Sequence, residues 1–297
     1  MSSLDREGPF TWQEVQVGPH LIRYRVAGPE DGEPMVHMHG FAISGTYLLP
    51  TAALLAQQYR VYVPDLPGFG RSPKPPNALG IDEMGQLLGQ FMDAVGLTSA
   101  VLVGNSLGCA IITELIYSQP EKVDRAVMVG LAGGQQNQPL VRAVGQMAKD
   151  GLREPPRLLT VAAPDYVRFG PARAIRLFSR MVSYPVAERF LQIPVPVLVV
   201  IGSEDPLRPN WRRIRRLLNR VPPQVRIVLL QGAAHAINFT HPNELASIIR
   251  QYLADEPIRM DAADPDGLPV LELMRPQIGP QSAPRQDPAP AAPPPES

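Results

Sequence analysis

The sequence predicts an α/β protein, in which one large domain is built on a mostly parallel, doubly wound sheet with an N-terminal antiparallel hairpin and an inserted helical cap. Short apolar runs typical of buried strands alternate with amphipathic helical patterns. Between residues 131 and 192 this alternation stops, and that segment is too long for a simple connection. The length of 297 residues accommodates one large domain with an insertion or two small domains.

The composition is that of a globular protein. Hydrophobic residues make up 44% of the chain and charged residues 19%, which argues against a disordered protein. Lys and Arg number 28 and Asp and Glu also number 28, so no net charge marks a nucleic-acid-binding surface. We therefore expect a small-molecule substrate that is neutral or weakly charged, and no nucleic acid partner.

The sequence gives no indication of membrane insertion. The first residues lack a basic segment followed by an apolar one, and no apolar run reaches about 18 residues. Cys109 is the only cysteine, so an intrachain disulfide bond is impossible and a reducing compartment is compatible. These features predict a cytoplasmic protein without a membrane span. Cys109 itself is interpreted as a packing residue in a buried helix.

The first half of the chain begins with a polar leader, residues 1–10, and continues with an antiparallel hairpin. Residues 11–17 and 21–26 alternate apolar and polar side chains around Gly18, which indicates two strands with one solvated face. The glycine- and proline-rich run at 65–72 predicts a tight loop. The other expected elements are strands at 34–38 and 60–64 and helices at 47–59 and 81–95.

The second half continues the sheet on both sides of the insertion. The expected elements are strands at 100–103, 125–129, 195–201 and 225–230 and helices at 111–116, 211–218 and 242–254. The helix at 211–218 carries four arginines. In a neutral protein such a basic face is interpreted as solvated surface rather than as a nucleic-acid site.

These elements divide the chain into four parts. Residues 11–130 and 193–255 form the predicted core, and residues 131–192 form the predicted cap. Residues 256–297 hold 11 of the 35 prolines, and such a tail is expected to be disordered because it cannot bury enough apolar surface. Only the stretch 270–274 is apolar enough to dock on the core.

One motif has the pattern of a nucleophile turn. The apolar run that ends at Val103 passes through Gly104-Asn105-Ser106-Leu107-Gly108 into a helical segment. A sharp turn from strand to helix presents a serine clear of its neighbours, and glycines two positions before and after it leave the necessary room. This context predicts Ser106 as a nucleophile, and an ordinary strand-to-helix turn is the alternative.

Five motifs in this order resemble the α/β-hydrolase fold superfamily, with a serine nucleophile, over residues 11–254. They are His39-Gly40-Phe41 after the third strand, Asp65-x-Pro-Gly-x-Gly-x-Ser after the fourth, Gly-Asn-Ser-Leu-Gly after the fifth, Gly202-x-x-Asp205 after the seventh and His235 after the eighth. Each motif is modest alone, whereas five in the right strand context form a specific signal. The cap is the part that diverges.

Five histidines compete for the role of general base. His20 lies in a hairpin turn and is expected at the surface. His37 and His39 share one face of a strand, which suits a metal pair, but no third ligand is evident. We interpret His37 as a satisfied core residue, and the resemblance implies that His39 braces the oxyanion loop. His241 precedes a proline at a helix start, so His235, in a loop of small residues, is the predicted base.

The acid that orients this base has two candidates at one strand end, Glu204 and Asp205. The Gly-x-x-Asp pattern of the superfamily favours Asp205. The order Ser106, Asp205, His235 is also the order of the triad in this fold. Asp65 is a further candidate acid, but the resemblance implies that this aspartate secures its own loop.

The resemblance also implies an oxyanion hole made of two backbone N–H groups. These belong to Leu107, which follows the nucleophile at a helix N-terminus, and to Phe41, in the loop supported by His39 and Gly40. The predicted reaction is hydrolysis of an ester-like bond through an acyl-enzyme, and it requires no cofactor and no metal.

Several alternatives remain open. A serine nucleophile excludes the dehalogenases and epoxide hydrolases of this fold, which use aspartate. Hydrolases of C–C bonds in aromatic ring-cleavage products resemble the chain at Gly-Asn-Ser-x-Gly. They commonly have Gly-x-Gly-Pro-Gly after His-Gly, where this chain has Phe-Ala-Ile-Ser-Gly at 41–45. They also commonly have Trp after the base, where this chain has Ala236. Cofactor-free perhydrolases and haloperoxidases, and a receptor-like member without activity, are further alternatives.

The cap is expected to determine the substrate. It contains nine basic and four acidic residues, which is compatible with an acidic substrate but is also typical of solvated surface. Its candidate lining residues are Phe169, Leu177, Phe178, Met181 and Tyr184, although their spacing equally fits a helix that packs on the core.

Overall fold

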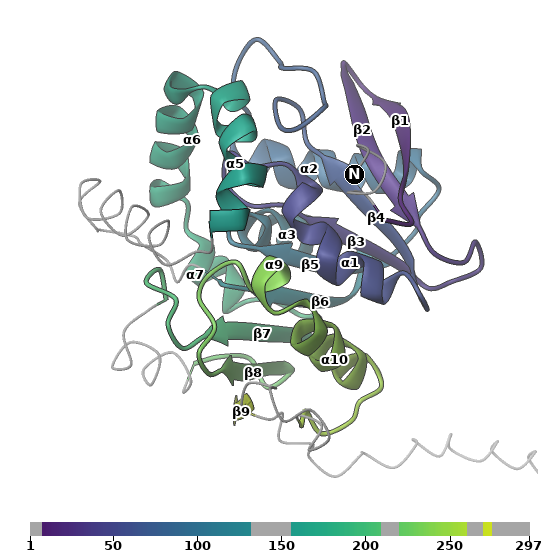
Figure 1. Ribbon diagram of the computed structural model, residues 1–297, viewed down its shortest axis with the longest axis vertical. Helices are drawn as coiled ribbons and strands as arrows, with labels where there is room; N and C mark the ends of the chain where they lie inside the picture. Colours follow the sequence, from purple (N-terminus) through teal and green to yellow (C-terminus); the bar gives the residue numbers. More distant parts are fainter. Residues whose placement is uncertain (1–7, 132–155, 209–219, 260–269, 275–297) are drawn as a thin grey trace, which may run out of the picture.

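A β-sheet runs through the described part of the molecule (Figure 1). The computed structural model describes residues 8–131, 156–208, 220–259 and 270–274, and within these residues the sheet has nine strands in the order β1-β2-β4-β3-β5-β6-β7-β8-β9. The strands are β1 (Thr11–Val17), β2 (His20–Ala27), β3 (Pro34–Met38), β4 (Arg60–Asp65), β5 (Ala100–Asn105), β6 (Val123–Val129), β7 (Val197–Gly202), β8 (Val225–Leu230) and β9 (Val270–Met274).

The strand directions confirm the predicted fold class. Strands β4, β3, β5, β6, β7 and β8 pair in parallel. The β1–β2 hairpin joins them through an antiparallel pairing of β2 with β4, and β9 pairs antiparallel with β8 at the other edge. The tail segment that is apolar enough to dock thus forms the last strand. The remainder of the tail beyond residue 259 lies outside the described residues.

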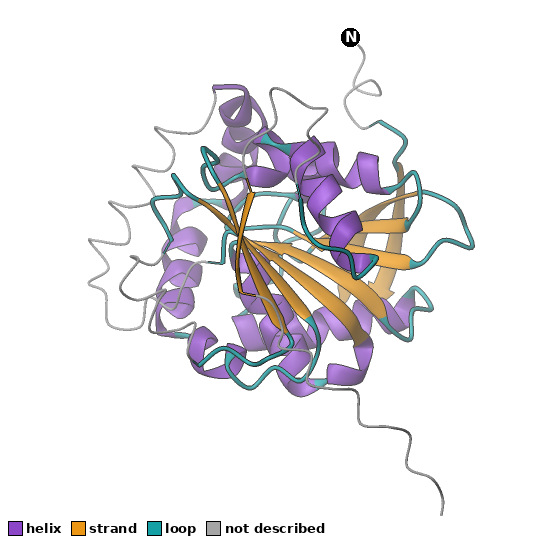
Figure 2. Cartoon of the chain, turned by 90° about the horizontal axis from the view of Figure 1, so that it is seen from below, coloured by secondary structure: helices purple, strands orange, loops and turns teal. Residues whose placement is uncertain are grey.

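Helices cover both faces of the sheet (Figure 2). The strands β5 to β8 are buried on both faces, and successive side chains along them enter two different hydrophobic clusters. One cluster contains the apolar faces of α2 (Ile81–Ala94) and α3 (Leu107–Ser118). The other contains those of α1 (Leu49–Leu55) and α10 (Pro242–Leu253). A parallel sheet that is covered in this way gives rigid strand ends for a site.

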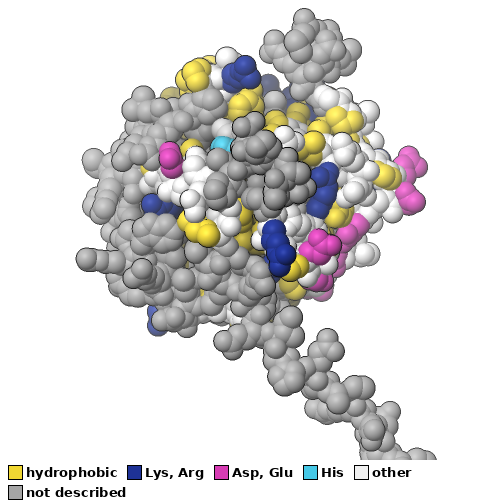
Figure 3. Space-filling view, turned by 60° about the horizontal axis from the view of Figure 1, so that its bottom comes forward, with side chains coloured by type: hydrophobic (Ala, Val, Ile, Leu, Met, Phe, Trp, Pro, Cys, Tyr) yellow, Lys and Arg dark blue, Asp and Glu magenta, His cyan; other side chains and the backbone are white. Residues whose placement is uncertain are grey.

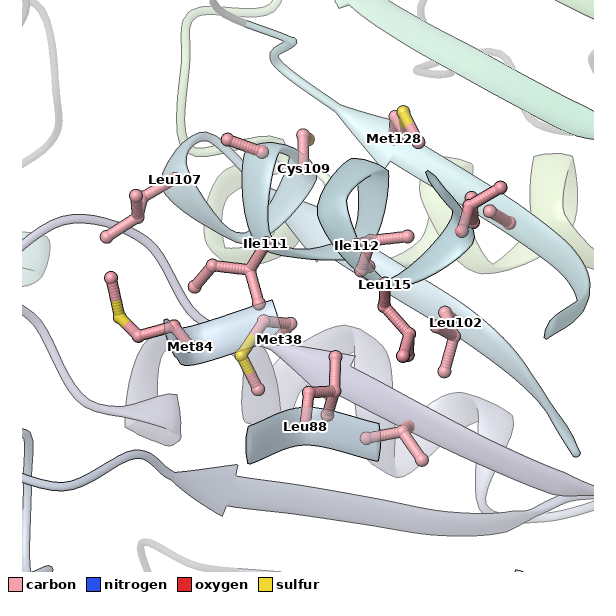
Figure 4. Close-up of a cluster of buried hydrophobic side chains, with 14 of the residues drawn as sticks. Met38, Met84, Leu88, Leu102, Leu107, Cys109, Ile111, Ile112, Leu115 and Met128 are labelled. Carbon is pink, nitrogen blue, oxygen red and sulfur yellow. The ribbon is translucent and has the colours of Figure 1, made fainter. Parts of the chain in front are cut away.

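The helix α3 is central to the first cluster (Figure 4). Its Ile111, Ile112 and Leu115 are fully buried against Met38 of β3 and Leu102 of β5. Burial of each such side chain stabilises the fold by about 1.5–3 kcal/mol. The helix that begins at the predicted nucleophile turn is therefore firmly attached to the sheet.

Within the described residues between β6 and β7, the segment expected to form a cap contains α5 (Pro156–Phe169), α6 (Pro171–Ser183) and α7 (Val186–Phe190). Residues 132–155 of this segment lie outside the described residues. Arginines attach α6 to the body. Arg173 donates to the carbonyl of Pro75, and Arg180 donates to the carbonyl of Ala78 at 3.1 Å and forms an ion pair with Glu83. Part of the basic excess of this segment is thus used in packing contacts rather than held free for a substrate.

A second polar contact attaches the end of the segment to α3. Glu114, in the middle of α3, is buried and forms an ion pair with Arg189 of α7. The hydroxyl of Tyr184 donates to the same carboxylate. The guanidinium of Arg189 also lies over the rings of Tyr117 and Tyr184. These contacts join α3 to the inserted helices.

Some element boundaries differ from those predicted. The helix expected at 47–59 is a 3-10 helix, η2 (Gly45–Leu48), followed by α1, since Pro50 fits the first turn of a new helix. A short helix, α9 (Ile237–Thr240), and the 3-10 helix η3 (Pro120–Lys122) were not predicted, because one or two turns carry too little periodicity. The arginine-rich helix expected at 211–218 lies outside the described residues.

The surface of the described part carries both signs of charge. On the face shown in Figure 3, basic and acidic side chains lie among hydrophobic ones. No helix of the described residues is long and apolar enough to cross a membrane. The cytoplasmic location stays a prediction.

Candidate active site

Ser106 lies in a sharp turn between β5 and α3. Its φ is 56° and its ψ is −112°, a left-handed conformation that is strained for a residue with a side chain. The turn is held by the Ser106 amide, which donates to the carbonyl of Val129 at 3.1 Å. Backbone strain of this kind concentrates at functional positions because the surrounding structure must maintain it.

The two flanking glycines are required by close packing. A Cβ on Gly108 would lie 2.3 Å from the carbonyl oxygen of Met38, and a Cβ on Gly104 would lie 2.7 Å from Ile112 and 2.8 Å from the Gly108 carbonyl carbon. Any larger residue would therefore push α3 away from β3 and β5. This is the physical reason for the Gly-x-Ser-x-Gly spacing in this chain.

The turn lies where the strand order reverses. From β3 the chain moves to β4 on one side, and it then crosses to β5 on the other side of β3. Ligands of open α/β sheets usually bind at such a switch point, beside the carboxyl ends of the strands, which here are β3 and β5. The loop after β3 reaches this point, since a Cβ on Gly40 would lie 3.5 Å from the Cβ of Ser106.

His235 and Asp205 meet at the carboxyl ends of β7 and β8. The Nδ1 of His235 lies 2.7 Å from Oδ2 of Asp205, and both side chains are buried. The other oxygen, Oδ1, accepts the amide of Leu207 at 2.7 Å. A carboxylate at Nδ1 requires the proton on that nitrogen, so Nε2 carries the lone pair of the neutral ring.

Glu204 does not take this position. Its backbone amide donates to the carbonyl of Ala233 at 3.0 Å and so holds the loop that carries His235. Close packing at Gly202 adds to this, since a Cβ there would lie 2.4 Å from the carbonyl oxygens of Ala233 and Ala234. Of the two candidate acids, Asp205 is the one that faces the imidazole.

Gly130, at the end of β6, makes room for the imidazole. Its φ is +60°, and a Cβ on it would lie 3.0 Å from both Cε1 and Nδ1 of His235. Its amide donates to the carbonyl of Val200 at 2.9 Å. Sequence reasoning missed this residue, although a glycine directly after an apolar strand was a usable signal.

The loop after β3 is braced by His39. Its Nδ1 lies 3.1 Å from the carbonyl oxygen of Gly40, and its Nε2 accepts the amide of Leu66 at 3.2 Å. Burial lowers the pKa of His39, with the charge of Asp65 acting in the opposite direction. Next to Phe41, Ala42 has a φ of 55° and is buried, so the predicted oxyanion loop is strained as well.

The other predicted oxyanion donor, Leu107, is the first residue of α3. An amide at this position has no acceptor within the helix and points out of its N-terminus. Both predicted donors, Leu107 and Phe41, thus belong to segments that flank Ser106.

Asp65 secures its own loop, as the resemblance implied. One carboxylate oxygen accepts the amide of Gly45 and the other that of Arg71, each at 2.9 Å. The buried guanidinium of Arg25 lies 3.7 Å from the same carboxylate. Asp65 is therefore a structural residue of the loops around β4 and is not the partner of His235.

The remaining histidines are placed elsewhere. His37 is fully buried, its Nε2 lies 3.3 Å from the sulfur of Met35, and burial lowers its pKa to about 3. His20 begins β2, and His241 precedes α10 with its Nδ1 2.8 Å from the hydroxyl of Thr240. Among the described residues, no group of three or more His, Cys, Asp or Glu side chains has the arrangement of a metal site.

Cys109 is fully buried in the first turn of α3, and burial raises its pKa well above its usual range. A thiol in this state is unreactive. The interpretation of Cys109 as a packing residue agrees with this position.

Aromatic rings connect the inserted helices with the loops around Ser106. The ring of Phe41 lies 5.7 Å from that of Phe178 on α6 and 6.5 Å from that of Phe169 on α5. Phe169 also contacts Phe69, at 4.7 Å. The carboxylate of Asp165 on α5 accepts the amide of Ser44 at 2.7 Å. Two of the expected cap residues, Phe169 and Phe178, thus lie against the predicted oxyanion loop.

Leu177 of α6 is also buried in the first hydrophobic cluster, and Met181 and Tyr184 are partly buried against it. These three residues pack on the core, which was the alternative interpretation of their spacing. Two long-range hydrogen bonds near the site were not visible in any sequence pattern. They join Asp165 to Ser44 and Asn105 to Tyr47.

The strand order and the helices on both faces of the sheet are those of the α/β hydrolase fold. A model of the alpha/beta hydrolase family matches residues 35–248. The match covers most of the chain, which therefore belongs to this family and is an enzyme of the hydrolase class.

Two relatives illustrate what the chain is similar to. The chain is 26% identical over 254 residues to the dihydrolipoyllysine-residue acetyltransferase component of the acetoin cleaving system of Pseudomonas putida. The match covers 78% of this chain and 66% of that protein, so the chain spans just under two thirds of that protein's length. It is also 26% identical over 253 residues to the pimeloyl-[acyl-carrier protein] methyl ester esterase of Aeromonas salmonicida, with 75% of this chain and 96% of that protein covered.

Among solved structures, a membrane phospholipase A described as a bacterial virulence factor superposes with a TM-score of 0.72 at 22% identity. The match covers 85% of this chain and 89% of that chain. At this identity the likeness establishes the fold alone.

Proposed function

We propose that the protein is a serine hydrolase that cleaves an ester-like bond of a small molecule through an acyl-enzyme, with Ser106 as nucleophile, His235 as base and Asp205 as orienting acid. The observation that carries this proposal is the 2.7 Å contact between His235 and Asp205 at the carboxyl ends of the strands. The strained turn at Ser106 supports it, because such a turn presents a hydroxyl to a base. The loop of His235 is bonded to Asn105, the residue before Ser106.

In the first half of the reaction, Nε2 of His235 accepts the hydroxyl proton while Oγ of Ser106 bonds to the substrate carbonyl carbon. The carbonyl electron pair moves to oxygen, and the backbone N–H groups of Leu107 and Phe41 stabilise that oxyanion. Each such donor contributes about 10²–10³ in rate. The intermediate collapses, the alcohol leaves with the proton from His235, and the acyl group stays on Ser106.

In the second half, water replaces the alcohol. His235 accepts a proton from water as its oxygen attacks the acyl carbon, and the carboxylic acid leaves while Ser106 recovers its proton. Asp205 remains ionised throughout and stabilises the imidazolium. The sequence of steps consumes one ester and one water and needs no metal or organic cofactor.

The ester-like substrate class has two supports. The names of two relatives, an acetyltransferase component and a methyl ester esterase, describe reactions at an acyl carbon. The aromatic rings of Phe41, Phe169 and Phe178 lie beside the predicted oxyanion loop and favour an apolar acyl or alcohol group. Arg173, Arg180 and Arg189 bond the body of the protein, which lessens the case for an acidic substrate.

The test is hydrolysis of p-nitrophenyl esters of graded chain length by the wild type and Ser106→Ala. Two further assays use an aromatic ring-cleavage product, for C–C hydrolysis, and a mixture of hydrogen peroxide and a carboxylic acid, for peracid formation. We expect ester hydrolysis that falls by several orders of magnitude in Ser106→Ala. Turnover of the ring-cleavage product or peracid formation, without esterase activity, would overturn the ester proposal in favour of the C–C hydrolase or the perhydrolase. Inactivity on every substrate would favour the receptor-like alternative.

A further inference from the structure

We propose that Tyr47 and Asn105 act together as positioning residues that join the predicted oxyanion loop to the loop of the predicted base. The inference rests on the proposed function for its catalytic consequence, while the hydrogen bonds that carry it stand independently. Neither side chain takes part in the triad. Both are buried, and both belong to well-packed elements, η2 and β5.

The first link is between the loop after β3 and the hydroxyl of Tyr47. The amide of Gly40 donates to this hydroxyl at 2.8 Å. The contact uses the N–H of Gly40, which leaves the next residue, Phe41, as the donor that this loop offers to an oxyanion. The hydroxyl also determines how closely the loop approaches the nucleophile, since a Cβ on Gly40 would lie 2.9 Å from it and 3.5 Å from the Ser106 Cβ.

The second link runs from Tyr47 to the residue before the nucleophile. The tyrosine hydroxyl donates to Oδ1 of Asn105 at 2.7 Å. A hydroxyl that accepts from one group and donates to another has a fixed orientation, so the two bonds stiffen each other.

The third link reaches the base. Nδ2 of Asn105 donates to the carbonyl of His235 at 3.3 Å and to that of Val129 at 3.2 Å. Two carbonyl acceptors determine which end of the amide carries nitrogen, because the opposite orientation would direct Oδ1 at two oxygens. Val129 also accepts the amide of Ser106 at 3.1 Å, so the same amide side chain connects the turn and the base loop.

The chain of bonds therefore runs from Gly40 through Tyr47 and Asn105 to His235. It crosses the loops that carry the predicted oxyanion donor, the nucleophile and the base. Its function is to fix the positions of these three groups relative to one another. Loss of a single bond should therefore alter the geometry of the transition state more than the binding of substrate.

The test compares Tyr47→Phe with Tyr24→Phe. Each change removes one tyrosine hydroxyl from a buried ring, and the hydroxyl of Tyr24 bonds Gln13 at 2.6 Å in the distant hairpin. We expect Tyr47→Phe to lower kcat for a p-nitrophenyl ester about tenfold with KM nearly unchanged, whereas Tyr24→Phe retains wild-type kinetics. Equal kcat values for the two variants would overturn the inference.

A second variant tests whether the two residues act as a unit. Asn105→Ala should also lower kcat, and the double variant with Tyr47→Phe should lose about as much as Asn105→Ala alone, because the bonds depend on each other. Losses that multiply would contradict a single chain of bonds.

Hydrogen exchange separates this inference from the proposed function and does not need activity. In Tyr47→Phe the amide of Gly40 should exchange faster than in the wild type, and in Tyr24→Phe it should not. If the wild-type protein has no hydrolase activity, the proposed function fails while this measurement still decides whether the bonds exist. An unchanged exchange rate of Gly40 in Tyr47→Phe would overturn the bonding chain itself.

Discussion

The imidazole of His235 and the carboxylate of Asp205 form a buried pair, with Nδ1 2.7 Å from Oδ2. Asp205→Asn should leave the fold intact but lower kcat by about 10³–10⁴, because an amide no longer fixes the tautomer or stabilises the imidazolium. Glu204→Gln, at the adjacent position, is the matched control and should retain activity. The kcat for ester hydrolysis by the two purified variants measures this difference. A larger loss of kcat in Glu204→Gln than in Asp205→Asn would show that Glu204, and not Asp205, is the acid.

Gly130 and Gly96 offer a matched pair of glycines with positive φ, +60° and +80°. An alanine at either position should destabilise the fold by about 1 kcal/mol through backbone strain. Only Gly130→Ala places a methyl group 3.0 Å from the ring of His235, whereas a Cβ on Gly96 meets nothing within 4 Å. We expect Gly130→Ala alone to lose esterase activity. Unaltered kinetics in Gly130→Ala would show that the ring does not occupy this position in solution.

His37 should make the protein less stable in weak acid. Its native pKa is about 3 because of burial, whereas an unfolded histidine has a pKa of about 6.5. Between these values the unfolded chain binds a proton that the native state does not, so the free energy of unfolding falls as the pH falls below about 6.5.

Between pH 7 and 5 this loss amounts to about 2 kcal/mol, and the lowered pKa of His39 acts in the same direction. His37→Val should reduce the difference in urea midpoint between the two pH values. At pH 8 the histidine is neutral in both the native and the unfolded state. The difference in urea midpoint between the wild type and His37→Val at this pH therefore measures the effect of the substitution on packing alone. An identical pH dependence in the wild type and the variant would contradict the buried, neutral His37.

Arg189 neutralises the buried carboxylate of Glu114. Arg189→Met should lower the free energy of unfolding by about 2 kcal/mol, less than for a fully buried pair because the arginine side chain is 26% exposed. Glu114→Gln in the same chain should recover part of this loss. Arg176→Met, at an exposed position of α6, is the control for removal of an arginine. Equal urea midpoints for Arg189→Met and Arg176→Met would argue against the ion pair.

Much of the fold was predictable from sequence because strands buried on both faces leave continuous apolar runs. β3 and β8 have the predicted bounds, and β5 differs only by its last two residues. The sharp turn at Ser106 was predictable because its glycines are required by close packing, as the 2.3 Å between a Cβ on Gly108 and the carbonyl oxygen of Met38 shows. The role of Ser106 as nucleophile stays a proposal.

Long-range hydrogen bonds were not predictable. Tyr47 and Asn105 are 58 positions apart, and Asp165 and Ser44 are 121 apart. Nothing in the local pattern of either partner indicates the other, because these pairs are brought together only by the order of strands in the sheet. Gly130 is an intermediate case, since a glycine at a strand end signals a special conformation but not the imidazole that it accommodates.

The central claim is that Ser106 forms a covalent intermediate, and labelling with a fluorophosphonate tests it most directly. Mass spectrometry of the peptides after reaction should place a single adduct on Ser106 of the wild-type protein. Ser106→Ala should take up no label, and Asp205→Asn should react far more slowly than Glu204→Gln. An intact wild-type protein that is not labelled, or an adduct on another serine, would contradict the proposed mechanism.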